Sequence, residues 1–249
     1  MMIEVRGLNK SFGSHVILEH VTFEIEKGES VVIIGRSGGG KSVLLKHLVG
    51  LLQPDSGQVL IDGENIVAMN ERQLLRVRRK FGMLFQGAAL FDSMTVAENV
   101  AFAFRRDRTL TDAQIACRVA EVLEMVDLPG IESKKPSELS GGMRKRVGLA
   151  RAIIYQPQIV LYDEPTTGLD PIVSDSIDKL IARVRDRLHV TSVVVTHDMR
   201  SARRLGQRIL MLHEGKFYTT GTAEQIFASQ DPIVRRFIDG VSDVKEVFF

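Results

Sequence analysis

A glycine-rich segment of eight residues, 35–42, constrains the fold of this chain more than any other feature. It reads Gly-Arg-Ser-Gly-Gly-Gly-Lys-Ser and fits the pattern G-x-x-x-x-G-K-[ST]. The apolar run Val31–Ile34 before it predicts a buried strand, and apolar residues at helical spacing follow it. A strand, a glycine-rich loop and a helix in this order indicate a loop whose backbone amides curl around phosphate groups. A glycine-rich turn without a ligand is the alternative.

Two side chains of this segment suit a nucleoside triphosphate and its metal ion. Lys41 places a positive charge between the β- and γ-phosphates, and the Ser42 hydroxyl can ligate Mg²⁺. We therefore expect the whole segment, together with the residue after it, to contact the nucleotide. These residues are Gly35, Arg36, Ser37, Gly38, Gly39, Gly40, Lys41, Ser42 and Val43.

Two adjacent carboxylates end another apolar strand, Ile159–Tyr162. Because successive side chains of an extended chain point to opposite sides, one carboxylate can bind metal while the other faces water. We expect Asp163 to contact Mg²⁺ and Glu164 to polarise the water molecule that attacks the γ-phosphate. A turn that only caps a helix is the alternative interpretation of this acidic pair.

The short segment Leu139–Met143 predicts a second phosphate-binding element. Its sequence, Leu-Ser-Gly-Gly-Met, opens a helix that is expected over roughly residues 142–155. Backbone N–H groups and the positive end of the helix dipole would then face an anion. The predicted contacts come from Ser140, Gly141, Gly142 and Met143.

Together these motifs resemble the ATPase subunits of ABC transporters, and the resemblance covers essentially the whole chain. Three further elements match in the family's order: Gln86 its Q-loop, Gly168–Asp170 its D-loop and His197 its switch histidine. The resemblance implies ATP and Mg²⁺ as cofactors, Gln86 as a metal ligand and catalytic residue, and Asp170 as a nucleotide contact. His197 follows a predicted strand and would hydrogen-bond the γ-phosphate or the attacking water; a purely structural histidine is the alternative.

The family also implies how copies of the chain assemble. Its ATPase subunits form head-to-tail dimers, so Ser140–Met143 of one copy would close over the ATP that Lys41 of the other holds. Two positions depart from the commonest family pattern. Met143 replaces a glutamine, which removes a polar contact and leaves the amides. Phe12 replaces the tyrosine that stacks on adenine and keeps the aromatic face; the alternative is a core residue of an N-terminal β-hairpin.

The order of predicted elements indicates an α/β fold. Strands that alternate with helices predict a mostly parallel sheet with helices on both faces, as in the P-loop NTPase core of ABC-type ATPases. These strands are expected at residues 81–85, 159–162, 192–196 and 209–212. Strands within residues 3–34 and 57–61 predict a small antiparallel β-subdomain. A helical subdomain is expected at about residues 88–155.

One ATPase domain, residues 1–240, is expected to account for nearly all of the 249 residues. The tail, residues 241–249, ends in Val-Phe-Phe, and we expect a possible contact with another subunit there. A frayed chain end is the alternative.

Composition bears on partners and location. The 33 basic and 31 acidic residues give no field strong enough to argue for a nucleic-acid partner. The N-terminus lacks the apolar core of a signal peptide, and the longest apolar run is five residues, Val100–Phe104. A membrane-spanning helix needs about 20 such residues. We therefore expect the pore to be a different polypeptide. The resemblance to ABC transporter ATPases then implies a peripheral subunit at the cytoplasmic face of the inner membrane.

The sequences of residues 84–100 and of the turn at Met143 are similar to the corresponding segments in ATPases of MCE-type (Mla-type) lipid transport systems. That similarity implies phospholipid or another lipid as cargo. It also implies three partners, namely a membrane permease, an MCE-domain lipid carrier and a small STAS-domain subunit. The apolar run Ala88–Phe91 could form part of the permease-docking groove, or it could pack inside the helical subdomain.

Three other functions remain open from the sequence. The main alternative is an importer ATPase for amino acids or another small solute, which would keep every catalytic residue. A soluble ABC ATPase of DNA repair or translation is disfavoured, because such proteins carry a coiled-coil insertion or a second ATPase domain. A catalytically inactive scaffold is disfavoured because Lys41, Asp163, Glu164 and His197 are all present.

Overall fold

The structure is a computed structural model that describes residues 1–106 and 110–241, with only the backbone described for residues 105 and 106. The predicted subunit contact of the tail therefore lies outside the described residues, except for Val241. None of the helices in the described part is long and apolar enough to cross a membrane.

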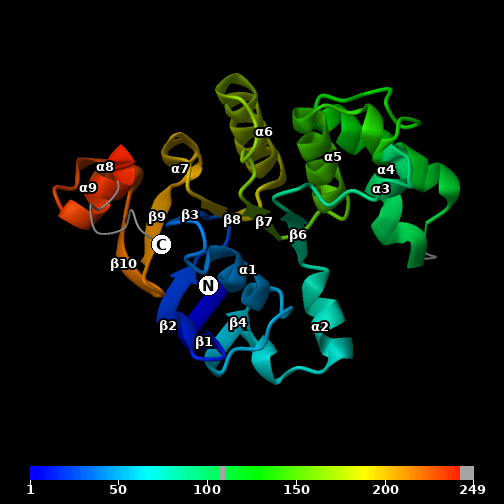
Figure 1. Cartoon of the computed structure of the whole chain (residues 1–249). Helices are drawn as coiled ribbons and strands as arrows, with labels where there is room; N and C mark the ends of the chain where they lie inside the picture. The colour runs from blue at the N-terminus through cyan, green and yellow to red at the C-terminus, as the bar shows by residue number, and fades with distance from the viewer. Residues whose placement is uncertain (107–109, 242–249) are drawn as a thin grey trace.

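The centre of the molecule is a sheet of six strands (Figure 1). In spatial order the strands are β10 (Lys216–Gly221), β9 (Arg208–His213), β3 (Ser30–Ile34), β8 (Thr191–Thr196), β7 (Ile159–Asp163) and β6 (Phe81–Leu84). All neighbours are parallel except β9 and β10. Every residue of β3, β7 and β8 is buried, as expected for strands covered on both faces. The predicted mostly parallel sheet is confirmed.

Separate hydrophobic cores cover the two faces of this sheet. Val32 and Ile34 of β3 belong to one core, and Val31 and Ile33 belong to the other, because alternate strand residues point to opposite faces. The first core includes residues of α5 (Gly141–Ile153), α6 (Pro171–Leu188) and α7 (Met199–Leu205). The second includes residues of α1 (Lys41–Leu48). The sheet is thus held between two layers.

A second, antiparallel sheet lies beside α1, as the sequence predicts (Figure 1). Its order is β2 (His15–Ile25), β1 (Ile3–Phe12), β4 (Ser56–Ile61) and β5 (Glu64–Asn65). The predicted range of 3–34 for this subdomain was wrong at its end, because residues 30–34 pair with β8 and β9 in the central sheet. The fully apolar run in these residues is typical of a central strand, whereas β1 and β2 alternate.

Residues 86–155 form only helices and loops where the structure describes them. The helices are α3 (Val96–Val100), α4 (Asp112–Met125) and α5, with short 3₁₀ segments at Ala101–Arg106 and Pro136–Glu138. They lie together at one end of the molecule (Figure 1). Helix α5 begins one residue and ends two residues before the predicted helix.

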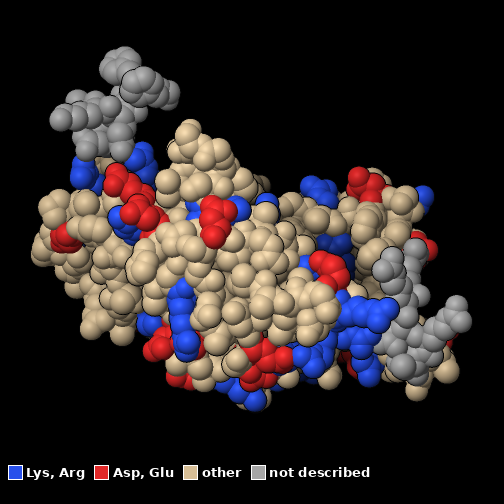
Figure 2. All heavy atoms as spheres, turned by 90° about the horizontal axis from the view of Figure 1, so that it is seen from below, with Lys and Arg blue, Asp and Glu red and all other residues tan. Residues whose placement is uncertain are grey.

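Three further helices were not predicted: α2 (Glu71–Arg78), α8 (Ala223–Ala228) and α9 (Pro232–Asp239). A single-turn 3₁₀ segment, Ile66–Ala68, precedes α2. On the face seen in Figure 2, basic and acidic side chains lie close to one another over much of the surface. Ion pairs between neighbouring surface side chains include Arg78–Glu71 and Lys80–Asp62.

Candidate nucleotide-binding and hydrolysis site

The predicted phosphate-binding loop joins the carboxyl end of β3 to the start of α1. Gly38 and Gly40 have φ values of 76° and 92°, in the left-handed region that favours glycine. An added Cβ at Gly40 would also lie 3.0 Å from the carbonyl oxygen of Ile17. The loop therefore packs closely against the antiparallel sheet. The N-terminal amides of α1 point toward the loop, and this arrangement suits a bound anion.

Lys41 is buried, with 5% of its surface exposed. Its Nζ donates hydrogen bonds to the carbonyl oxygens of Gly35 (2.8 Å) and Arg36 (2.9 Å), and lies 3.5 Å from Glu164 Oε1. Burial lowers the pKa of Lys41, and the nearby Glu164 carboxylate opposes that shift. The loop thus holds the cation between its own backbone and the acidic end of β7.

Asp163 is connected directly to the phosphate-binding loop. Ser42 Oγ donates a 2.8 Å hydrogen bond to Asp163 Oδ1. Burial raises the pKa of the Asp163 carboxyl above its usual value, while the bond from Ser42 opposes the shift. Gln86 follows β6, the strand next to β7, and is exposed. A hydroxyl and a carboxylate brought this close are the hard oxygen donors that Mg²⁺ prefers, so the residues present fit that ion.

Glu164 accepts contacts from two directions. Its Oε2 lies 2.8 Å from His197 Nδ1 and accepts a 3.1 Å hydrogen bond from Thr167 Oγ1. The expectation that one of the two carboxylates faces water is wrong, because Asp163 and Glu164 are only 8% and 7% exposed. The chain is also not extended at Glu164, where φ is 48°. That turn directs the Glu164 carboxylate to Lys41 and His197, which was not foreseen.

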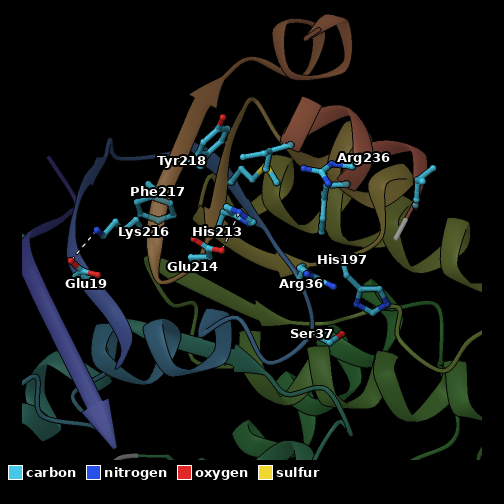
Figure 3. Close-up of a pocket in the computed structure, with 15 residues that line it drawn as sticks. Glu19, Arg36, Ser37, His197, His213, Glu214, Lys216, Phe217, Tyr218 and Arg236 are labelled. Carbon is cyan, nitrogen blue, oxygen red and sulfur yellow. Dashed lines mark ion pairs between the residues drawn. The ribbon is translucent and has the colours of Figure 1, made fainter. Parts of the chain in front are cut away.

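His197 directly follows β8 and is half-exposed, so its ring lies at the rim of the site. A cavity of about 950 Å³ opens beside it and beside the phosphate-binding loop. In Figure 3, Arg36, Ser37 and His197 lie near one another at this cavity, and Arg236 of α9 reaches it from another side. The β9–β10 hairpin supplies the remaining labelled residues except Glu19, which pairs with Lys216 (Figure 3).

Phe12 is the last residue of β1, and its ring is 50% exposed. The alternative that it is a core residue of the hairpin is therefore wrong. Lys10 Nζ lies 5.5 Å from the ring centroid. An exposed aromatic face on the antiparallel sheet is available for stacking.

The segment Ser140–Met143 starts α5, as predicted, but its contacts lead to α6. Ser140 Oγ accepts a hydrogen bond from the Met143 N–H (3.2 Å), so one of the helix-start amides is capped. A Cβ on Gly142 would lie 2.7 Å from Val173 Cγ1, and one on Gly141 would lie 3.2 Å from Leu169 Cδ2. These glycines therefore let α5 approach the start of α6 closely.

Asp170, the predicted D-loop acid, caps α6. Its Oδ1 accepts hydrogen bonds from the amides of Ile172 (2.9 Å) and Val173 (3.0 Å). Helices α5 and α1 lie in separate parts of the molecule (Figure 1). A single copy thus groups Lys41, Ser42, Asp163, Glu164 and His197 in one place, and sets the Ser140–Met143 and Asp170 turns together in another.

Two contacts of Glu164 were not predicted from the sequence. The Thr167 hydroxyl binds its carboxylate, and Lys145 Nζ donates to its carbonyl oxygen (3.2 Å). A hydroxyl three residues after an acid gives a weak local signal for the first contact. Lys145 gives none, because a lysine in a helix start normally predicts a solvent-facing side chain.

Comparison with known proteins fits this geometry. Residues 18–167 match the family described as ABC transporter. Similar sequences include the probable ribonucleotide transport ATP-binding protein mkl of Mycobacterium leprae, 44% identical over 96% of this chain and 69% of that protein. The mkl protein of Mycobacterium tuberculosis H37Rv has the same identity, and the chain spans 66% of its length. The intermembrane phospholipid transport system ATP-binding protein MlaF of Haemophilus influenzae is 40% identical, over 97% of this chain and 92% of that protein.

Similar solved structures include two of the bacterial ABC transporter cassette MJ0796. Its dimeric structure superposes with a TM-score of 0.82 at 34% identity, covering 89% of this chain and 99% of that chain. A dimeric post-hydrolysis state of MJ0796 bound to ADP and Pi gives a TM-score of 0.81 at 33% identity, with the same coverage.

Proposed function

Because the chain belongs to the ABC transporter family and is an ATP-hydrolysing cassette of that family, we propose that two copies assemble head to tail on ATP and drive lipid transport through a separate membrane permease. One observation carries the chemical part of this proposal. Lys41 of the phosphate-binding loop, the Glu164 carboxylate and the His197 ring form one continuous set of contacts.

Each residue of this set has a task that its contacts support. The amides of residues 38–42 and the Lys41 ammonium bind the β- and γ-phosphates. Glu164 orients the attacking water and accepts its proton at a carboxylate oxygen, and its two hydrogen-bond partners fix the direction of that oxygen. His197 holds Glu164 through Nδ1 and directs the rest of its ring toward the γ-phosphate. Phe12 stacks on the adenine.

Mg²⁺ fits beside Ser42 and Asp163. Those two residues and Gln86 would hold the ion, which when bound neutralises charge on the phosphate oxygens. The protein itself supplies the other positive charges that stabilise the phosphates. Lys41, the loop amides and α1 all present positive charge or dipole to the same anion.

The second copy would supply the Ser140–Met143 turn that a single copy holds away from its own phosphate-binding loop. The Ser140–Met143 turn lies away from the phosphate-binding loop of its own chain, beside α6 and Asp170. In a head-to-tail pair the turn of each copy would close over the γ-phosphate held by the other, with Gly141 and Gly142 contributing their amides. The dimeric state of the similar MJ0796 cassette supports this arrangement.

The lipid cargo is proposed from the names of similar proteins. The MlaF relatives are named for intermembrane phospholipid transport and match 97% of this chain. For the permease, the exposed rings of Phe91 and Phe102 have centroids 4.6 Å apart and form an apolar surface that a permease helix can cover. The proposed partners are that permease, an MCE-domain lipid carrier and a STAS-domain subunit. The chain would act at the cytoplasmic face of the inner membrane.

A small-solute importer is the second candidate, because the mkl relatives are named for probable ribonucleotide transport. Purification of the native membrane complex separates the two functions. We expect mass spectrometry to find bound phospholipid and the ATPase rate of the complex to rise with added phospholipid. Stimulation by a solute-binding protein or a ribonucleotide, with no bound lipid, would contradict lipid transport and leave the ATPase assignment intact.

A further inference from the structure

One face of α5 is packed against the loop that follows β6. Lys145, Gly148 and Arg151 are spaced three residues apart and therefore share this face. A Cβ on Gly148 would lie 2.9 Å from Leu84 Cδ1 and 3.1 Å from Ala88 Cβ. The absence of a side chain at Gly148 thus brings the cationic side chains on either side of it within reach of that loop.

Lys145 uses this approach to contact the backbone of two site residues. It is only 5% exposed, and its Nζ donates hydrogen bonds to the carbonyl oxygens of Gln86 and Glu164. It forms no ion pair with any carboxylate of the described residues. Burial lowers the pKa of Lys145, while the charges of Asp163 and Glu164 raise it. A buried cation that only supported packing would be costly here, because an apolar side chain could fill the same space.

Arg151 makes a similar contact one turn and a half later. Its Nη1 donates to the carbonyl oxygen of Ala89 and its Nη2 to that of Ala88, both at 2.7 Å. Two parallel N–H donors fix both carbonyls at once. Helix α5 therefore holds residues 86, 88 and 89 by hydrogen bonds to their carbonyl oxygens.

The carbonyls bound by these two cations include those of three strained residues. Glu164, Ala88 and Ala89 have φ values of 48°, 59° and 49°, in the left-handed region that residues other than glycine rarely adopt. Such conformations persist only where the surroundings determine them, and they concentrate at functional sites. In each case a cation of α5 donates to the strained residue's own carbonyl oxygen.

We propose that Lys145 is a positioning residue for ATP hydrolysis, which ties the helix that begins at the Ser-Gly-Gly turn to the backbone of both Gln86 and Glu164. The inference rests on the proposed function, since it assumes that a triphosphate held by the second copy acts on the start of α5. Any displacement of α5 is then passed to the Q-loop and to the catalytic carboxylate together.

Lys145→Met tests this role because methionine keeps the length and volume of the side chain and removes its donors. We expect kcat for ATP to fall at least about tenfold with KM changed less than about twofold. Hydrogen exchange of the amides in residues 85–91 should become faster without nucleotide. Lys145→Gln, which keeps an N–H donor without the charge, should restore kcat to within about threefold of the parent. Lys179→Met, at an exposed lysine of α6, is the matched control and should change neither readout.

Parental kcat and parental exchange in Lys145→Met would overturn the proposal, and so would a rise in KM alone. Equal losses in the Met and Gln variants would assign the effect to the charge and overturn the positioning role. If circular dichroism shows that Lys145→Met does not fold, the Lys145→Gln variant decides. Faster exchange at residues 85–91 of that variant, together with a kcat below a third of the parent's, would then contradict the proposal. A parent chain without ATPase activity would contradict the proposed function, while the exchange measurement would still test the tie.

Discussion

At the scale of single residues, Glu164 is a buried residue whose carboxylate and backbone carbonyl both have partners. Its side chain contacts Lys41, Thr167 and His197, and its carbonyl oxygen accepts a hydrogen bond from Lys145. The left-handed backbone at Glu164 makes this possible by turning the side chain away from the direction that an extended strand would give it. Orientation by several fixed partners is what a general base requires.

Glu164→Gln should bind ATP and fail to hydrolyse it. Glutamine keeps the shape and most hydrogen bonds of the site but cannot accept the proton of the attacking water. We expect kcat to fall by about 10²–10³-fold, with the Kd for ATP changed less than about threefold. Single-turnover hydrolysis and equilibrium nucleotide binding measure the two quantities. Turnover at the parental rate would rule out the base assignment.

Asp178 predicts a pH dependence of stability. The side chain is buried in α6, its Oδ2 accepts a 2.8 Å hydrogen bond from Ser201 Oγ, and burial raises its pKa from 3.8 to about 6. Between these two pKa values the folded state keeps a proton on Asp178 that the unfolded state has lost. The stabilisation that comes from the protonated carboxyl is therefore complete below about pH 4 and is lost as pH rises through about 6. The charged groups that face it are Arg204 and Asp198 from the α7 side and Asp175 from its own helix.

Asp178→Asn removes that titration. The free energy of unfolding of the parent, relative to that of the variant, should fall by about 2–3 kcal/mol between pH 4 and pH 8. Urea unfolding at a series of pH values measures the difference. Asp186→Asn, on the exposed side of α6, serves as the control and should follow the parent. Parallel curves for the parent and Asp178→Asn would show that the carboxyl has an ordinary pKa.

At the scale of elements, the parts that the sequence predicts well are those with a local cause. The order of strand, glycine loop and helix at residues 31–48 follows from hydrophobic run length and from residues that tolerate left-handed backbone, and the structure agrees. Helices α2 and α9 are amphipathic, but each spans only eight residues, so their periodicity extends over little more than two turns. The role of Lys145 as a backbone contact depends on which elements become neighbours, and a linear pattern does not contain that information. The cap formed by Asp170 is local, because its partners follow it by two and three residues.

The junction of α5 and α6 gives an element-scale prediction. Alanine normally stabilises a helix relative to glycine by about 1 kcal/mol. At Gly142 the sign should reverse, because the added Cβ would lie 2.7 Å from Val173 Cγ1. We expect Gly142→Ala to lower the free energy of unfolding by about 1–3 kcal/mol, as overpacking does. Adding Val173→Ala should recover part of the loss, and a stabilised single variant would show that the two helices are not in close contact.

At the scale of the whole molecule, one copy contains two incomplete halves of a site. The phosphate-binding loop and the acidic end of β7 lie at the carboxyl edge of the central sheet, and the Ser140–Met143 turn lies at the junction of α5 with α6. The sequence predicts both halves, but their separation within one chain is visible only in the fold (Figure 1). That separation is why we assign hydrolysis to a pair of copies.

Mixing two inactive variants tests this assignment most directly. Lys41→Ala disables the phosphate-binding loop. Ser140→Asp keeps an N-cap at the start of α5 and places a carboxylate where the second copy's γ-phosphate is expected. Each variant alone should therefore hydrolyse ATP at least about 100-fold more slowly than the parent. In a head-to-tail pair that contains one of each, one site has both halves intact. An equimolar mixture should recover activity well above the sum of the two variants, toward about a quarter of the parental rate if the sites act independently. A mixture no more active than that sum, at concentrations where the parent hydrolyses ATP, would contradict this assignment.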